Sequence, residues 1–408
     1  MNSVVQLLSH VKELRAYFTV GSWQEDLNLT SFLGYGGRVA TGWHNIVSQL
    51  WNGSTTVHAP HGFKSVIDAL GLGFDGTNMH DAAELLNIVI GALDEDTNKI
   101  TNKTYVKNKD IDGSANRTVE SKLAWEAYAL NNCSIITDTF MGQKESSMTC
   151  PKCNHTSVSY DAFSSLMLPI PMRPLERTGV SLDACFEEHA AAENDVEWKC
   201  PICQENVAAT KTTAVTRLPD VLVVSLNRFD NDGYKIETLV EYPLDGFDMA
   251  PHCAVNSNGT KKLYDLVGVS NHYNRFSPAI RKHYTTSCRD QLGEPWWLMN
   301  DAKIELYENP QEVVSNAGYI LVYQARTTIV ADEDAMEVEE DSNNDNEDAS
   351  DEDSENDFND EMESEMESEI EMEMEGDGEG VGEEEERREG KYFKAKRACI
   401  TYMESNCS

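Results

Sequence analysis

The chain has 408 residues, of which 40% are hydrophobic and 25% charged, and this length allows one large or two ordinary domains with ample core. Its formal net charge is −38, but residues 331–390 hold 31 acidic residues against two arginines, a net of −29, which leaves −9 for the rest. There is no run of eighteen apolar residues, and the first ten residues carry no basic region or cleavage-site pattern, so we expect neither a membrane span nor a signal peptide.

The first third of the chain has the periodicity of helices. Apolar residues recur at helical spacing from Val4 to Phe18, which predicts one opening helix with Ser3 as its N-cap. The same spacing predicts helices over residues 81–93 and 119–130.

After about residue 134 the pattern changes to short apolar runs separated by Pro, Gly and Asn. Such runs predict the strands of an antiparallel sheet. They cover residues 166–170, 221–226, 264–270 and 319–323. Because the predicted helices come first along the chain and the predicted strands follow, we expect an α+β fold.

The end of the chain has another composition again. From residue 331 it is mainly Glu, Asp, Ser, Asn and Met, which cannot bury enough apolar surface to offset the entropy of ordering. We therefore predict a folded domain over residues 1–326 and an acidic disordered tail over residues 327–408. Such a tail is usually a solvated spacer, and the alternative is a segment that binds basic proteins such as histones.

Two Cys-x-x-Cys pairs indicate a metal site. They are Cys150 with Cys153 and Cys200 with Cys203. The thiolates of each pair can reach one ion, and four sulfurs complete a closed tetrahedral Zn²⁺ site, so we predict a structural zinc ion. The alternative is four ordinary thiols or two independent redox pairs.

A candidate catalytic group lies near the end of the folded part, where His283 is followed by Asn300 and Asp301. A cysteine hydrolase needs an imidazole to deprotonate its thiol and an Asn or Asp to orient that imidazole. On spacing alone, a surface pair is the commoner explanation for a His near an Asp.

Four segments, taken in order, resemble the sequence boxes of the ubiquitin-specific proteases. Residues 1–8 are similar to the end of the cysteine box, residues 80–86 to the Gln-Asp-Ala box, residues 218–229 to the Leu-Pro strand and residues 269–323 to the histidine box. Residues 93–170 and 267–273 are most similar to the subgroup that also carries DUSP and ubiquitin-like domains.

This resemblance implies a papain-like cysteine protease fold with a helical thumb over about residues 1–130, an antiparallel-sheet palm and zinc-bearing fingers. The activity that it implies is thiol-dependent hydrolysis of isopeptide and peptide bonds at the C-terminal Gly of ubiquitin. His283 would be the general base, Asn300 would orient it, and Asp301 could share that role. The four cysteines named above would hold the zinc of the fingers.

The chain departs from the family pattern in two places. The family's nucleophilic cysteine stands two positions before the residue matched by Met1, so no residue of this sequence matches it. Residues 274–282 contain Arg, Phe and Lys where relatives have glycines, and these side chains would crowd the channel for ubiquitin's C-terminus. Two hypotheses follow, a deubiquitinase whose cysteine box lies outside this sequence, and a catalytically dead ubiquitin-binding scaffold.

The expected partners are ubiquitin and ubiquitinated proteins, with neither nucleic acid nor a membrane among them. The ten cysteines and the lack of sorting signals favour the cytoplasm or the nucleus.

Overall fold

The computed structural model describes nine stretches of the chain. They are residues 1–52, 57–74, 80–104, 111–171, 179–230, 232–254, 263–275, 281–289 and 293–326. The predicted acidic tail, residues 327–408, lies outside them, so its disorder stays a prediction.

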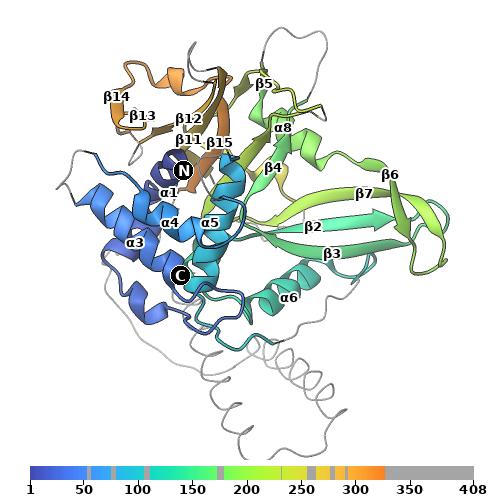
Figure 1. Ribbon diagram of the computed structural model, residues 1–408. Coiled ribbons are helices and arrows are strands. Elements are labelled where there is room, and N and C mark those ends of the chain that lie inside the picture. Colours follow the sequence, from blue (N-terminus) through green and yellow to red (C-terminus); the bar gives the residue numbers. More distant parts are fainter. Residues whose placement is uncertain are drawn as a thin grey trace, which may run out of the picture. The chain divides into compact units, whose positions relative to one another are not determined.

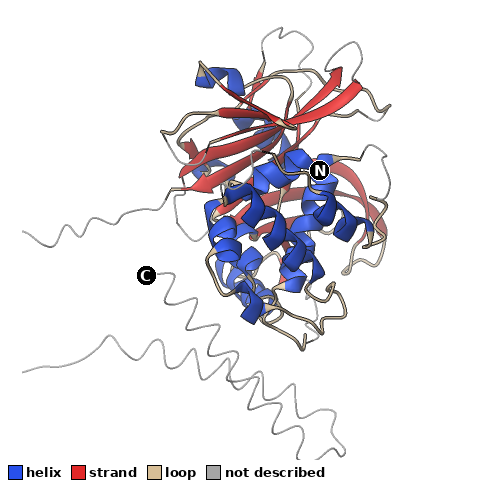
Figure 2. Cartoon of the chain, turned by 60° about the vertical axis from the view of Figure 1, so that its left-hand side comes forward, coloured by secondary structure: helices blue, strands red, loops and turns tan. Residues whose placement is uncertain are grey.

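Helices form the first part of the molecule and strands the second, as the sequence predicts for an α+β fold (Figures 1 and 2). Figure 2 shows most helices gathered on one side and the main sheet on the other. The helices of the first part are α1 (Asn2–Ser9), α2 (Lys12–Thr19), α3 (Arg38–Trp51), α4 (His61–Asp68), α5 (Ala82–Asp96), α6 (Arg117–Ala129) and α7 (Ile135–Phe140).

The prediction of one opening helix is wrong, because the helix ends at Ser9 and a second one begins at Lys12. Val11 between them has extended backbone, with φ −72° and ψ 110°. Its side chain and that of Phe18 are nevertheless fully buried, so the apolar spacing continues through the break. Ser3 is not the N-cap either, since Met1 takes that position and Ser3 lies inside α1.

One sheet of five antiparallel strands forms the fingers. Its strands lie in the order β1 (Ile111–Asp112), β3 (Thr156–Phe163), β2 (Gly142–Thr149), β7 (Asn206–Arg217) and β6 (Glu193–Lys199). In Figure 1 the long strands β2, β3 and β7 run together away from α3, α4 and α5, with α6 beside β3.

A larger sheet forms the palm. In order, its strands are β14 (Lys303–Leu306), β13 (Trp297–Asn300), β12 (Arg281–Cys288), β11 (Leu263–Arg275), β15 (Gly318–Ala325), β8 (Val221–Asn227) and β4 (Leu166–Pro169), and β10 (Phe247–Asp248) also pairs with β11. The antiparallel prediction holds except for β4, which runs parallel to β8. The helix α8 (Leu182–Ala190) packs beside β4, and β5 (Val180–Ser181) pairs with β9 (Val240–Glu241) in a small parallel sheet.

One apolar cluster joins the thumb helices to the palm sheet. It includes Leu7 and Leu8 from α1 and Leu86 from α5, all fully buried, together with Val223 of β8 and Ile320 of β15. This shared core fixes α1 against the sheet. Among the described residues, no helix is both long and apolar enough to span a membrane.

Asp96, at the end of α5, stabilises the loop that leads into α3. Its buried carboxylate accepts hydrogen bonds from the backbone N–H groups of Tyr35, Gly37, Val39 and Ala40, at 2.8 to 3.1 Å. The first turn of a helix has N–H groups without intrahelical partners, and this carboxylate satisfies them.

Asp96→Ala should therefore destabilise the protein by about 3 kcal/mol or more, because several buried donors lose their acceptor. Urea unfolding would measure the loss, with the exposed Glu13→Ala as the control, expected to change stability by less than about 1 kcal/mol. If the two variants were equally stable, this carboxylate would not anchor the loop.

Candidate active site and metal centre

The palm sheet brings His283 and Asn300 together. His283 lies on β12 and Asn300 ends the neighbouring strand β13. The Nε2 atom of His283 lies 2.8 Å from Oδ1 of Asn300, whereas the nearest oxygen of Asp301 is 3.9 Å away. Asn300 is thus in hydrogen-bond contact with the imidazole, and Asp301 stands just beyond it. The catalytic roles of all three residues remain predictions.

The start of α1 faces the same place. The Asn2 side chain donates a hydrogen bond from Nδ2 to Oδ1 of Asp301, at 2.6 Å. The buried hydroxyl of Ser3 lies 2.5 Å from that of Ser270 on β11 and 3.0 Å from that of Thr286 on β12. The expectation that Ser3 caps the helix is thus replaced by a polar contact between α1 and the two strands.

A second polar group, around Asp81, borders the start of α1. Asp81 is the N-cap of α5, where its Oδ1 accepts from the N–H groups of Ala83 and Glu84, and the Tyr319 hydroxyl donates to its Oδ2 at 2.7 Å. Burial, reinforced by the nearby Asp81 carboxylate, holds the pKa of the Tyr284 hydroxyl well above its usual range. The sequence predicts a helix that begins at residue 81, but it gives no sign of the bond between Asp81 and Tyr319, which are 238 positions apart.

A small pocket of about 100 Å³ opens between these elements. Its lining includes Met1, Ser3, Lys64, His80 and Tyr284. A larger cavity of about 610 Å³ lies between α3 and α4, but neither His283 nor Asn300 borders it. His283 and Asn300 are not among the residues that line the small pocket either, which reaches the start of α1 through Met1 and Ser3.

Eight cysteines lie in the described part of the chain, and none of them is at the start of α1. Burial raises the pKa of the Cys185 and Cys253 thiols to about 11, so these two are poor thiolates. Cys288 is fully buried in the core shared by α1 and the palm. The predicted crowding before His283 falls mainly on residues 276–280, which lie outside the described residues.

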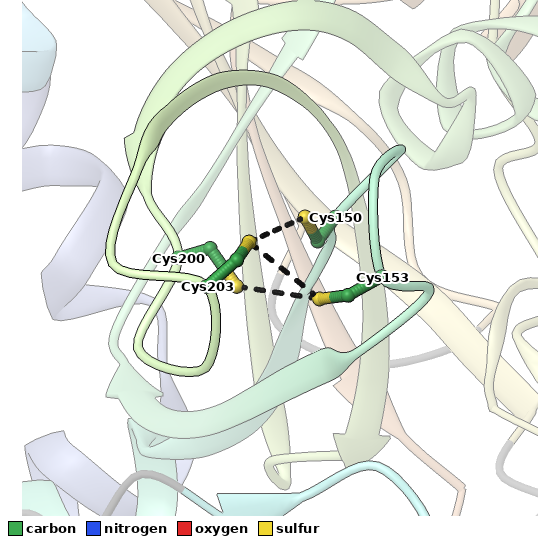
Figure 3. A group of neighbouring side chains, drawn as sticks. All are labelled: Cys150, Cys153, Cys200 and Cys203. Atoms are coloured by element: carbon green, nitrogen blue, oxygen red, sulfur yellow. Dashed lines mark hydrogen bonds between the residues drawn. The ribbon is translucent and has the colours of Figure 1, made fainter.

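The four paired cysteines converge at the end of the fingers (Figure 3). Cys150 and Cys153 lie in the turn after β2, and Cys200 and Cys203 in the turn after β6. The Sγ atoms of Cys153 and Cys200 are 3.6 Å apart, those of Cys150 and Cys203 are 3.7 Å apart, and all four lie within 4.8 Å of one another. A tetrahedron with Zn–S bonds of about 2.3 Å has edges of about 3.8 Å, so this donor set fits zinc.

The two turns have the same local geometry. In each, the residue after the second cysteine has a left-handed backbone, with φ 56° at both Asn154 and Gln204. In each, that residue's N–H donates to the carbonyl of the first cysteine, Cys150 or Cys200. The cluster confirms the predicted structural metal site, and four thiolates leave no open position for catalysis.

Comparison with known proteins gives a consistent result. A family model described as ubiquitin carboxyl-terminal hydrolase matches residues 1–323. The chain is 28% identical over 353 residues to ubiquitin carboxyl-terminal hydrolase 4 of Saccharomyces cerevisiae, covering 79% of this chain and 38% of that protein. It is 28% identical over 333 residues to human ubiquitin carboxyl-terminal hydrolase 2, covering 79% of this chain and 53% of that protein.

Among solved structures, a SAGA DUB module containing Ubp8 and bound to monoubiquitin matches with a TM-score of 0.59. It is 20% identical in sequence, and the match covers 80% of this chain and 66% of that one. This likeness supports the predicted fold. The chain spans about two fifths to one half of the length of the curated relatives named above. The predicted subgroup with DUSP and ubiquitin-like domains stays a prediction.

Proposed function

The chain belongs to the ubiquitin carboxyl-terminal hydrolase family, and from this premise we propose that the protein is a deubiquitinase. Its reaction would be thiol-dependent hydrolysis of the isopeptide or peptide bond at the C-terminal Gly of ubiquitin. The observation that carries the proposal is the contact of His283 with Asn300, beside the N-terminal end of α1. The cytoplasm or nucleus, as the place of action, is part of the same proposal.

In this mechanism His283 moves the proton. Because Asn300 Oδ1 accepts from Nε2–H, Nδ1 is the ring nitrogen for proton transfer. It takes the proton of the thiol as the sulfur adds to the carbonyl carbon, and gives it to the lysine amine as the C–N bond breaks and the acyl-enzyme forms. The same nitrogen then takes a proton from a water molecule that attacks the thioester, and returns it to the sulfur as the carboxylate of ubiquitin is released. Asn300 keeps the ring in the tautomer and orientation that this transfer needs.

According to the family pattern, the attacking thiol belongs at the start of α1, two positions before the residue matched by Met1. A helix N-terminus favours a thiolate, because its N–H groups carry partial positive charge. The buried contacts of Ser3 with Ser270 and Thr286 hold this helix end against the strand of His283. The chain therefore supplies the base, its orienting residue and a fixed place for the nucleophile.

Ubiquitin is the proposed partner, because the fold neighbour named above is a complex with monoubiquitin. The palm and fingers would grip it, with the zinc cluster fixing the tips of the finger strands. Binding of basic proteins by the acidic tail is a further proposal, which rests on its composition alone.

Ubiquitin binding can be measured directly on the 408-residue chain by isothermal titration calorimetry. We expect saturable binding to monoubiquitin, and weaker binding to ubiquitin without its C-terminal Gly-Gly, since in the proposed reaction this tail lies beside His283. If no binding is seen at ubiquitin concentrations up to about 1 mM, the proposed function is contradicted. A Kd of about 1 mM corresponds to a binding free energy of roughly −4 kcal/mol.

A further inference from the structure

The hairpin turn that follows Asn300 is tied to the first residue of α1. Strands β13 and β14 are joined through Asp301 and Ala302, and Asn300 pairs with Lys303 across the turn. Asp301 has a left-handed backbone, with φ 52°. Its Oδ1 accepts from Asn2 at 2.6 Å, while its Oδ2 lies 3.9 Å from Nε2 of His283.

We propose that Asn2 is a positioning residue, which holds Asp301 so that Asn300 alone makes the hydrogen bond to His283 and the Asp301 carboxylate stays beside the ring. This inference rests on the proposed function, because it assigns Asn2 a part in the same reaction. Asn2 would align the base and would not touch the reacting atoms.

The contact links two elements whose relative position decides the reaction. Asn2 belongs to the helix end where the thiol is placed, and the turn carries the residue that orients the base. A misplacement of about 1 Å can cost roughly 10²-fold in rate, so a bond between these two elements affects alignment directly.

The exposure of the two residues argues against a role in stability. The Asp301 side chain is 57% exposed and Asn2 is exposed as well. Hydrogen bonds and ion pairs at such positions contribute little to folding. The buried contacts of Ser3 already hold α1 against the sheet, so loss of the Asn2 bond should leave the fold intact.

The two carboxylate oxygens of Asp301 have different neighbours. Because Asn2 engages Oδ1, only Oδ2 is directed at the ring, from a distance that leaves the Asn300 contact in place.

The test compares Asn2→Ala, Asp301→Ala and the double variant, with Asn45→Ala as a matched control on the exposed surface of α3. The first readout is the NMR signal of the His283 Nε2–H proton in the 408-residue chain, assigned with His283→Gln. We expect Asn2→Ala to shift this signal and speed its exchange with water, with an unchanged melting temperature. Asn45→Ala should leave it as it is.

The second readout is a double-mutant cycle on cleavage of a ubiquitin-linked fluorophore, in a form of the protein that carries the thiol. Asn2→Ala should lower kcat by about tenfold or more with KM little changed, and the double variant should be no slower than the slower single variant. The inference would be overturned if Asn2→Ala left the His283 signal unchanged and the losses of kcat in the two single variants added up in the double variant. If the NMR effect appears but no form cleaves ubiquitin, the proposed function fails and the positioning of His283 by Asn2 stands.

Discussion

In a form of the protein that carries the thiol, His283→Ala is expected to abolish ubiquitin cleavage, lowering kcat by roughly 10⁴- to 10⁶-fold, as removal of the base does in related nucleophile–base systems. In the proposed mechanism, the contact of Nε2 with Asn300 orients the ring for the transfer of a proton to and from the attacking sulfur.

The assay is release of a fluorophore from the C-terminus of ubiquitin, under single-turnover conditions that separate chemistry from product release. His58→Ala is the matched control, because His58 lines the larger cavity between α3 and α4. Ubiquitin affinity should be nearly the same in both variants. A His283→Ala protein within about tenfold of the parent would exclude His283 as the base.

Loss of the metal is expected to have the second large effect. Structural zinc in small peptide sites binds with an apparent free energy of about 10–16 kcal/mol, and that energy stabilises the folded state. The purified chain should contain one zinc ion, and Cys200→Ser should release it, since Cys200 supplies one of the four sulfurs, which lies 3.6 Å from that of Cys153.

Metal analysis and thermal unfolding measure this effect together. We expect the melting temperature of Cys200→Ser to fall by at least about 5 °C, and chelator treatment to lower that of the parent protein similarly. Cys253→Ser, at a half-buried thiol outside the cluster, is the control. A metal-free chain that unfolds at the same temperature as the zinc-loaded chain would rule out a structural zinc site.

Local patterns predicted much of this molecule. The two Cys-x-x-Cys pairs are short-range signals, because each turn is formed by neighbouring residues, and the structure joins them through the pairing of β2 with β7. The spacing of apolar residues likewise predicted α5 and the central strands of the palm. It also marks α3, where Val39, Trp43, Ile46 and Val47 are buried at helical spacing, although residues 38–51 are not among the helices predicted above.

Contacts between distant segments could not be read from those patterns. The break between α1 and α2 leaves the apolar spacing intact, so periodicity gives no sign of it. The contacts of Ser3 with β11 and β12 join residues more than 260 positions apart. Whether Asn300 or Asp301 contacts His283 depends on the turn between β13 and β14. Asn2, far away in the sequence, helps to fix the geometry of that turn.

The most direct test of the account is cleavage of a ubiquitin-linked fluorophore by the chain with Cys-Tyr placed before Met1, as in the family's cysteine box. If the helix end and His283 form a working site, this protein should cleave the substrate, and both Cys→Ala at the added position and His283→Ala should stop it. A protein that binds ubiquitin with the cysteine in place, yet does not cleave it, would contradict the account and favour the catalytically dead scaffold.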